Sequence, residues 1–174
     1  MRLKTFTSRE RAALIPIELV ATAKYGMIIF PILFLLGGLG GPGDFWANAL
    51  NHGLFAAFAF LVALLAGAVL TPLLLPWLPG RAFSLKGLSM GLLAALILAV
   101  FRLEGLATWP GRLEVAAWCL LIPAVAAYLG MNFTGASTYT SLSGVKKEMR
   151  WAVPLEIAFA VVGLSLWLSS RFVG

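Results

Sequence analysis

The chain has few of the residues from which soluble surfaces and metal sites are built. Among its 174 residues there is one cysteine, Cys119, and one histidine, His52, and only 11% of the residues are charged. One cysteine excludes a disulfide framework and a thiolate cluster, and one histidine excludes a bis-imidazole haem site or a histidine-built zinc site within one copy. The scarcity of charge excludes a soluble domain with a solvated surface.

Apolar residues take their place, and they occur in long runs. They make up 61% of the chain, and the mean hydropathy is +0.96. A helix needs about 20 mainly apolar residues to cross roughly 30 Å of hydrocarbon, because its backbone groups must pair within the segment. The sequence therefore predicts an all-α integral membrane protein, a bundle of five transmembrane helices in a lipid bilayer, with spans at approximately 16–36, 45–70, 85–101, 113–131 and 151–170.

The basic residues predict the orientation of this single transmembrane domain, which covers residues 1–174. Lysine and arginine number 13 against seven acidic residues, and in membrane proteins they concentrate in cytoplasmic segments. A cytoplasmic N-terminus and an outside C-terminus put nine on the inner side and three, Arg102, Arg112 and Arg171, on the other, while the thirteenth, Lys24, lies within a span. The nine are Arg2, Lys4, Arg9, Arg11, Arg81, Lys86, Lys146, Lys147 and Arg150. We expect a multi-pass protein of the inner membrane and no nucleic-acid partner.

Local patterns suggest how the spans begin and approach one another. Thr7 and Glu10 match a capping box, which predicts a short interfacial helix within residues 1–15, and Pro16 suits the first turn of the first span. The glycine-rich segment 37–43 contains the letters of a dinucleotide fingerprint, but no strand precedes it, so we interpret it as a tight outer turn. Gly87 and Gly91 form a small-xxx-small pair that would let another helix approach closely.

Three ionisable residues fall within predicted spans, where an unpaired charge costs about 2.5–3.5 kcal/mol. Glu18 and Glu156 each follow a proline at the cytoplasmic end of a span. They are either helix-start carboxylates stabilised by the helix dipole or buried groups that face the bundle interior. Lys24 lies deeper, which predicts a pairing with one of these carboxylates, or else an anion or proton site.

A polar face follows the start of the second span. Asp44, Asn48, Asn51 and His52 stand at i, i+4, i+7 and i+8, so they share one side of a helix. We expect that side to point into the bundle. For His52 an interhelical hydrogen bond is the simpler interpretation, and a ligand role is the alternative.

A hydroxyl-rich segment separates the last two predicted spans and ends in basic residues. It is either an ordinary polar loop or a cytoplasmic docking surface, on which hydroxyls and exposed N–H groups bind a partner while the cations attract anions. The candidate docking residues are Asn132, Thr134, Ser137, Thr138, Thr140, Ser141, Lys146, Lys147 and Arg150.

This segment also carries a resemblance to a known family. Met131 to Ser141, Gly144-Val145, Glu148-Met149-Arg150 and the earlier Ile15-Pro16-Ile17-Glu18-Leu19 resemble the membrane domain of the mercury-methylating corrinoid proteins of the HgcA family. The likeness covers essentially the whole chain and is most specific at 131–150. It implies a domain that anchors and positions a cytoplasmic corrinoid (cobalamin) module, which methylates Hg(II) and is recharged by a ferredoxin-like iron–sulfur protein.

The chain departs from the family pattern in one respect. The Asn-Val-Trp-Cys signature of the corrinoid module does not occur, and Cys119 matches nothing in it. The resemblance therefore implies no catalytic, cofactor-binding or metal-binding residue in this chain and no activity from the chain alone. It implies that the corrinoid-binding domain would precede residue 1 in a longer protein.

Two other hypotheses belong to different functional classes. A small transporter or channel would move Hg(II), methylmercury or another small solute along Glu18, Lys24 and Glu156. A haem- or quinone-binding subunit is the third hypothesis, and the single histidine argues against it.

Overall fold

The computed structural model of the chain describes residues 8–80, 82–138 and 142–173, without the side chains of 8–14, 17, 18, 21, 133–138 and 142–145. Within these ranges the chain is helical and contains no strand, which confirms the all-α prediction. Helices are the expected outcome because an apolar run in apolar surroundings must pair its own N–H and C=O groups.

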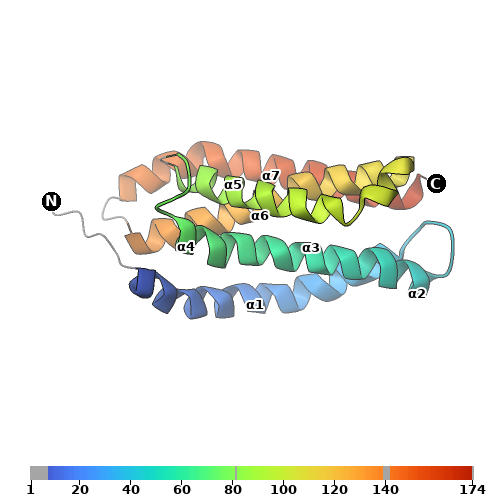
Figure 1. Ribbon diagram of the computed structural model, residues 1–174, viewed down its shortest axis with the longest axis horizontal. Helices are drawn as coiled ribbons and strands as arrows, with labels where there is room; N and C mark the ends of the chain where they lie inside the picture. The colour runs from blue at the N-terminus through green and yellow to red at the C-terminus, as the bar shows by residue number, and fades with distance from the viewer. Residues whose placement is uncertain (1–7, 81, 139–141, 174) are drawn as a thin grey trace.

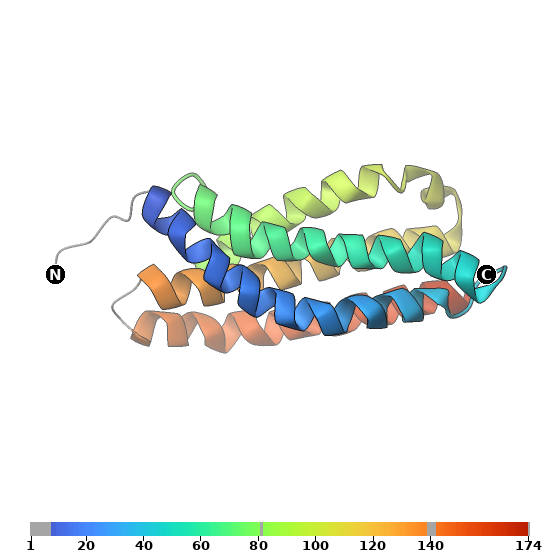
Figure 2. The same cartoon turned by 90° about the horizontal axis from the view of Figure 1, so that it is seen from below.

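The helices form long rods that run alternately up and down beside one another (Figures 1 and 2). The start of α1 and the end of α7 lie at opposite ends of the bundle (Figure 1). The second rod is the continuous helix Phe45–Leu74, and it contains five consecutive segments, α2, η1, α3, η2 and α4. In chain order the elements are α1 (Ser8–Gly38), α2 (Phe45–Asn48), η1 (Ala49–Gly53), α3 (Leu54–Leu65), η2 (Ala66–Leu70), α4 (Thr71–Leu74), α5 (Phe83–Val100), η3 (Leu103–Ala107), α6 (Trp109–Thr138) and α7 (Leu142–Phe172).

Four helices in the described ranges are long and apolar enough to cross a membrane. They are Phe45–Leu74, Phe83–Val100, Trp109–Asn132 and Lys146–Phe172, and α1 contributes the shorter apolar segment Thr22–Gly38. Many of their large apolar side chains are exposed on the outside of the bundle, Leu96 at 62% and Val161 at 58% among them. Such a surface suits lipid rather than water.

Two boundaries differ from the sequence-based expectations. The helix α1 runs without a break from Ser8, so Pro16 lies inside it rather than in its first turn. The segment at 132–150 is not a long loop, because α6 continues to Thr138 and α7 begins at Leu142. Prolines and hydroxyl side chains weaken a helix only modestly in apolar surroundings, where the alternative is an unpaired backbone.

The second rod shows how a proline is accommodated. The π-helical segment η2 comes directly before Thr71 and Pro72. Pro72 has no N–H to donate, and the hydroxyl of Thr71 donates to the carbonyl of Ala66 at 2.7 Å across the wider turn. Both residues are fully buried, so the side chain satisfies a backbone group that no solvent reaches.

Small residues bring α5 against α6. A Cβ atom on Gly87 would lie 2.7 Å from the Cα of Ala127, and one on Gly91 would lie 2.5 Å from the Cα of Pro123. The close approach expected from this glycine pair is therefore confirmed, and its partner is α6. On the other side of the bundle α1 packs on the second rod, where Gly37 meets the backbone of Gly53.

The substitution Gly91→Ala tests this packing. We expect it to lower the free energy of unfolding by about 1–3 kcal/mol, because the added methyl group meets backbone that cannot rotate away. A detergent titration followed by circular dichroism measures the change. Gly105→Ala is the matched control, since its Cβ would lie 3.8 Å from the nearest neighbour. Equal stability of both variants would show that α5 and α6 are further apart in the membrane.

Candidate functional site

Polar side chains gather in two regions of the bundle, one at an end and one near the middle. The first, which we call the terminal polar cluster, lies near the end of α7 and consists of Asn51, His52, Arg102, Glu114 and Arg171. The second is a cavity near the middle of α1 and α7, which we call the lateral pocket. The two regions differ in whether their ionisable groups have partners.

His52 and Glu114 are the centre of the terminal polar cluster. The Nδ1 atom of His52 lies 3.1 Å and 3.2 Å from the two carboxylate oxygens of Glu114. The Glu114 side chain is 3% exposed and that of His52 is 22% exposed. His52 belongs to the π-helical segment η1, a local geometry that often occurs at functional positions. The pair joins the second rod to α6.

Two arginines lie within electrostatic reach of the same carboxylate. Arg102 donates to the side-chain oxygen of Asn51 at 3.1 Å and to its carbonyl at 2.8 Å, and its guanidinium lies 4.1 Å from the centre of the Phe55 ring. Arg171 is buried, and its Nε donates to the hydroxyl of Ser170 at 3.3 Å. The cluster therefore connects the second rod, the end of α5, α6 and α7.

The glycine turn at 39–43 closes this end of the bundle. Gly40 has a φ of +69°, which favours glycine, and a Cβ there would overlap the carbonyl of Arg171. Asn48 donates its side-chain amide to the Gly40 carbonyl at 2.9 Å. The predicted tight turn is confirmed, and Asn48 is the side chain that holds it.

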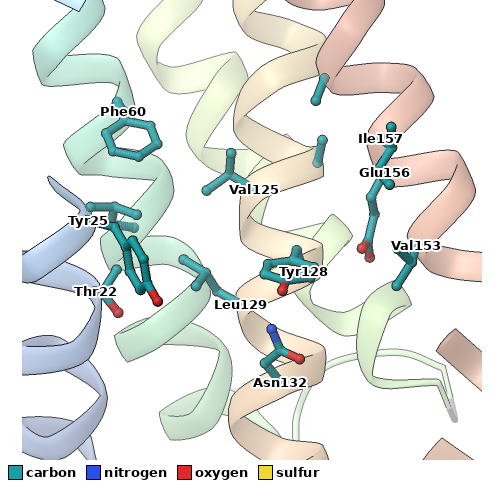
Figure 3. Close-up of a pocket in the computed structure, with 13 residues that line it drawn as sticks. Thr22, Tyr25, Phe60, Val125, Tyr128, Leu129, Asn132, Val153, Glu156 and Ile157 are labelled. Carbon is teal, nitrogen blue, oxygen red and sulfur yellow. The ribbon is translucent and has the colours of Figure 1, made fainter. Parts of the chain in front are cut away.

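The lateral pocket is a cavity of about 760 Å³ between α1, α3, α6 and α7. Figure 3 shows Thr22 and Tyr25 on one side, Tyr128, Leu129 and Asn132 of α6 in the middle, and Val153, Glu156 and Ile157 of α7 on the other side. It exists because α1 packs on the second rod while α7 packs on α6, and no extensive contact joins α1 to α7. The remaining lining residues are Phe60, Leu64, Ala124, Val125 and Ala160.

Glu156 is the ionisable residue of this pocket. Glu156 is 8% exposed, and neither of its carboxylate oxygens has a hydrogen-bond partner. α7 begins at Leu142, 14 residues earlier, which puts Glu156 roughly 21 Å along the helix at about 1.5 Å per residue. The helix dipole acts mainly on the first turn. The interpretation of Glu156 as a helix-start carboxylate is therefore wrong.

The structure places the other candidate residues in different surroundings. Lys24 is exposed and forms no ion pair with a described side chain, so the expected pairing with Glu156 does not form. Asn132 lines the lateral pocket, whereas Lys146, Lys147 and Arg150 are exposed. Asp44 and Asn51 are exposed as well, while Asn48 and His52 face inward. The side chains of Glu18, Thr134, Ser137 and Thr138, and all of Thr140 and Ser141, lie outside the described residues.

Sequence reasoning missed three residues that matter here. Glu114 lies at the very start of a predicted span, where an acidic residue is common and gives no sign of a buried pair. Tyr128 belongs to an apolar run and gives no separate signal. Glu148, set among basic residues, accepts a hydrogen bond from the backbone N–H of Ser84 at 2.6 Å, so it stabilises the first turn of α5.

The pair of His52 and Glu114 can be tested by removing either partner. Glu114→Ala should lower the free energy of unfolding by about 3–5 kcal/mol, because it leaves the buried Arg171 without a nearby carboxylate and the His52 ring without its hydrogen-bond partner. His52→Ala should cost about 1–3 kcal/mol, since its side chain is partly exposed. Glu104→Ala, at an exposed acid, is the control and should stay within about 0.5 kcal/mol of the unsubstituted chain. A Glu114 variant as stable as the control would contradict the pairing.

Comparisons with known proteins identify no family for the chain. A scan against protein-family models finds no match, and neither curated proteins nor solved structures give one. The resemblance to the HgcA family therefore rests on the residues quoted for it, and the two polar regions are interpreted from their own geometry.

Proposed function

We propose that residues 1–174 form the membrane domain of a corrinoid-dependent mercury methyltransferase. The domain anchors a corrinoid-binding module and positions it at the cytoplasmic surface of the inner membrane, where that module methylates Hg(II). Two features support the proposal: the resemblance of residues 131–150 to the HgcA family, and the distribution of charge at one end of the bundle.

The proposed topology has five spans, with α1 as the first and α7 as the last. The N-terminus is cytoplasmic and the C-terminus lies outside, so that the α6–α7 connection faces the cytoplasm. Basic residues favour this orientation, because lysine and arginine near the ends of spans are retained on the cytoplasmic side.

One observation carries the proposal, the cationic surface at the start of α7. Lys146, Lys147 and Arg150 are exposed, at the end of the bundle where α1 begins and α6 ends (Figure 2). The acid among them, Glu148, is already engaged by the backbone of Ser84. The exposed charge of this surface is therefore positive, which suits an acidic face of a docked module beside anionic lipid headgroups.

The chemistry of methyl transfer is assigned to the corrinoid module and not to this chain. Cys119, the one thiol, packs against an apolar cluster that includes Trp118 and Ile122. In the proposed topology Cys119 lies within the span of α6 and not at the cytoplasmic surface, so we do not propose it as a cobalt ligand. The ferredoxin-like iron–sulfur protein is proposed to act on the same module.

Cysteine labelling tests the orientation. In a Cys119→Ser background, Glu104→Cys should react with a membrane-impermeant maleimide on intact cells, because it lies at the outer end. Lys147→Cys should react only after the cells are permeabilised. The Cys119→Ser chain alone is the control and should not be labelled. The opposite pattern would reverse the orientation and remove the docking surface from the cytoplasm.

Replacing the hydroxyls of the α6–α7 connection tests docking. In the full polypeptide that carries the corrinoid module, combined alanine substitution of Thr134, Ser137, Thr138 and Thr140 should reduce methylmercury formation several-fold while membrane insertion is retained. The physical reason is the loss of hydrogen bonds at the docked surface. Ser165 and Ser169, which are exposed in the second half of α7, are replaced by alanine as the control. Unchanged methylation with normal expression would leave the domain as a simple anchor.

A further inference from the structure

The lateral pocket presents an ionisable group that has no partner among the residues the structure describes. Both carboxylate oxygens of Glu156 are buried and unpaired, within a helix long and apolar enough to span a membrane. None of the residues that line the pocket is a lysine, arginine or histidine. Unpaired ionisable groups inside a membrane are costly and generally mark a path or site for a substrate, ion or proton.

Aromatic side chains accompany this carboxylate. Tyr25, Phe60 and Tyr128 line the same pocket, from α1, α3 and α6 (Figure 3). The face of an aromatic ring attracts a cation that lies within about 6 Å of its centre, and the attraction grows as water is removed. The carboxylate and the rings therefore both favour a positively charged ligand.

The pocket opens toward the lipid-facing side of the bundle. Tyr25 is 67% exposed and Tyr128 is 45% exposed, although both line the cavity, so they flank its opening. Tyr128 and Glu156 belong to segments that are apolar enough to span a membrane, and Tyr25 to the apolar segment of α1. A ligand that dissolves in the bilayer can therefore enter from the side.

The donor set distinguishes between classes of cation. Calcium takes about six to eight oxygen ligands and magnesium about six, and several of these are usually carboxylates or carbonyls. The lining provides a single carboxylate, and its other polar side chains are the neutral ones of Thr22, Tyr25, Tyr128 and Asn132. Mercury is a soft ion that prefers thiolates, and no cysteine lines the pocket. An organic cation is satisfied by one carboxylate and aromatic faces, and the apolar walls suit its hydrocarbon groups.

We propose that the lateral pocket binds an amphipathic organic cation, which enters from the bilayer and places its charged centre against Glu156. Its apolar body lies between Tyr128 of α6 and the side chains of α1 and α3. The volume of about 760 Å³ lies within the range of roughly 300–1,000 Å³ typical of small-molecule sites.

Binding of tetraphenylphosphonium to the whole chain in phosphatidylcholine nanodiscs tests the proposal. This lipophilic aromatic cation has an anionic counterpart of the same shape, tetraphenylborate, which separates charge recognition from partition into lipid. We expect saturable binding of the cation, measured by equilibrium dialysis of the radiolabelled compound against empty nanodiscs, and no saturable binding of the anion.

Two variants separate the contributions of the pocket. Glu156→Gln keeps the size of the side chain and loses its charge, and it should weaken cation binding about tenfold or more. Since Glu156 has no partner to lose, the variant should elute and melt like the unsubstituted chain. Tyr128→Leu removes one ring at an exposed position and should weaken binding several-fold. Glu104→Gln removes an exposed acid outside the pocket and should leave the affinity unchanged.

Three results would overturn the proposal. Equal affinity of the Glu156→Gln and Glu104→Gln variants would show that the carboxylate takes no part. Saturable binding of tetraphenylborate at the same affinity would show recognition of shape alone. A phospholipid that co-purifies with the chain in native mass spectrometry, and that the cation does not displace, would show that the pocket is a lipid site. If Glu156→Gln fails to insert, the Tyr128→Leu variant decides, since unchanged affinity there contradicts the aromatic contact.

Discussion

The absence of solvent for polar groups is the constraint on which this bundle depends. An apolar surrounding makes every unpaired N–H or C=O costly, and the chain responds with helices that continue through positions where soluble helices commonly end. At Pro72 the missing N–H coincides with a π-helical turn and a hydroxyl bond from Thr71. The continuity of α1 through Pro16 and of α6 through the hydroxyl-rich residues follows from the same constraint.

The two polar regions illustrate opposite uses of a buried charge. In the terminal polar cluster Glu114 is matched by His52 and lies near two arginines, so its negative charge is compensated within the chain. Such a pair fixes which faces of neighbouring helices meet, whether or not it adds net stability. In the lateral pocket Glu156 has no hydrogen-bond partner among the described residues, so a cation from outside the chain would stabilise its ionised form. This difference is why the first region is interpreted as structural and the second as a binding site.

Helix packing explains why the pocket lies where it does. Gly87 and Gly91 bring α5 against the backbone of α6, and Gly163 lets α7 approach Leu121 of the same helix. The second rod holds α1 through contacts of its own. The second rod also packs on α6, so the helices diverge only between α1 and α7, which make no extensive contact. Arg150 of the cationic surface and Val153 of the pocket are one helical turn apart on α7, so the proposed docking surface and the pocket are neighbours along one helix.

The sequence by itself determined the helical class, the approximate positions of four helices apolar and long enough to cross a membrane, the glycine turn and the close approach at Gly91, because run length and residue size act locally. Only the tertiary structure decided which polar groups meet. His52 and Glu114 are 62 residues apart, and Ser84 and Glu148 are 64 apart, and their contact depends on how each helix is rotated and which helices are neighbours. The spacing of residues within one helix does not determine how that helix is rotated or which helices pack against it. The lack of a hydrogen-bond partner for Glu156 likewise depends on which side chains the neighbouring helices present to it.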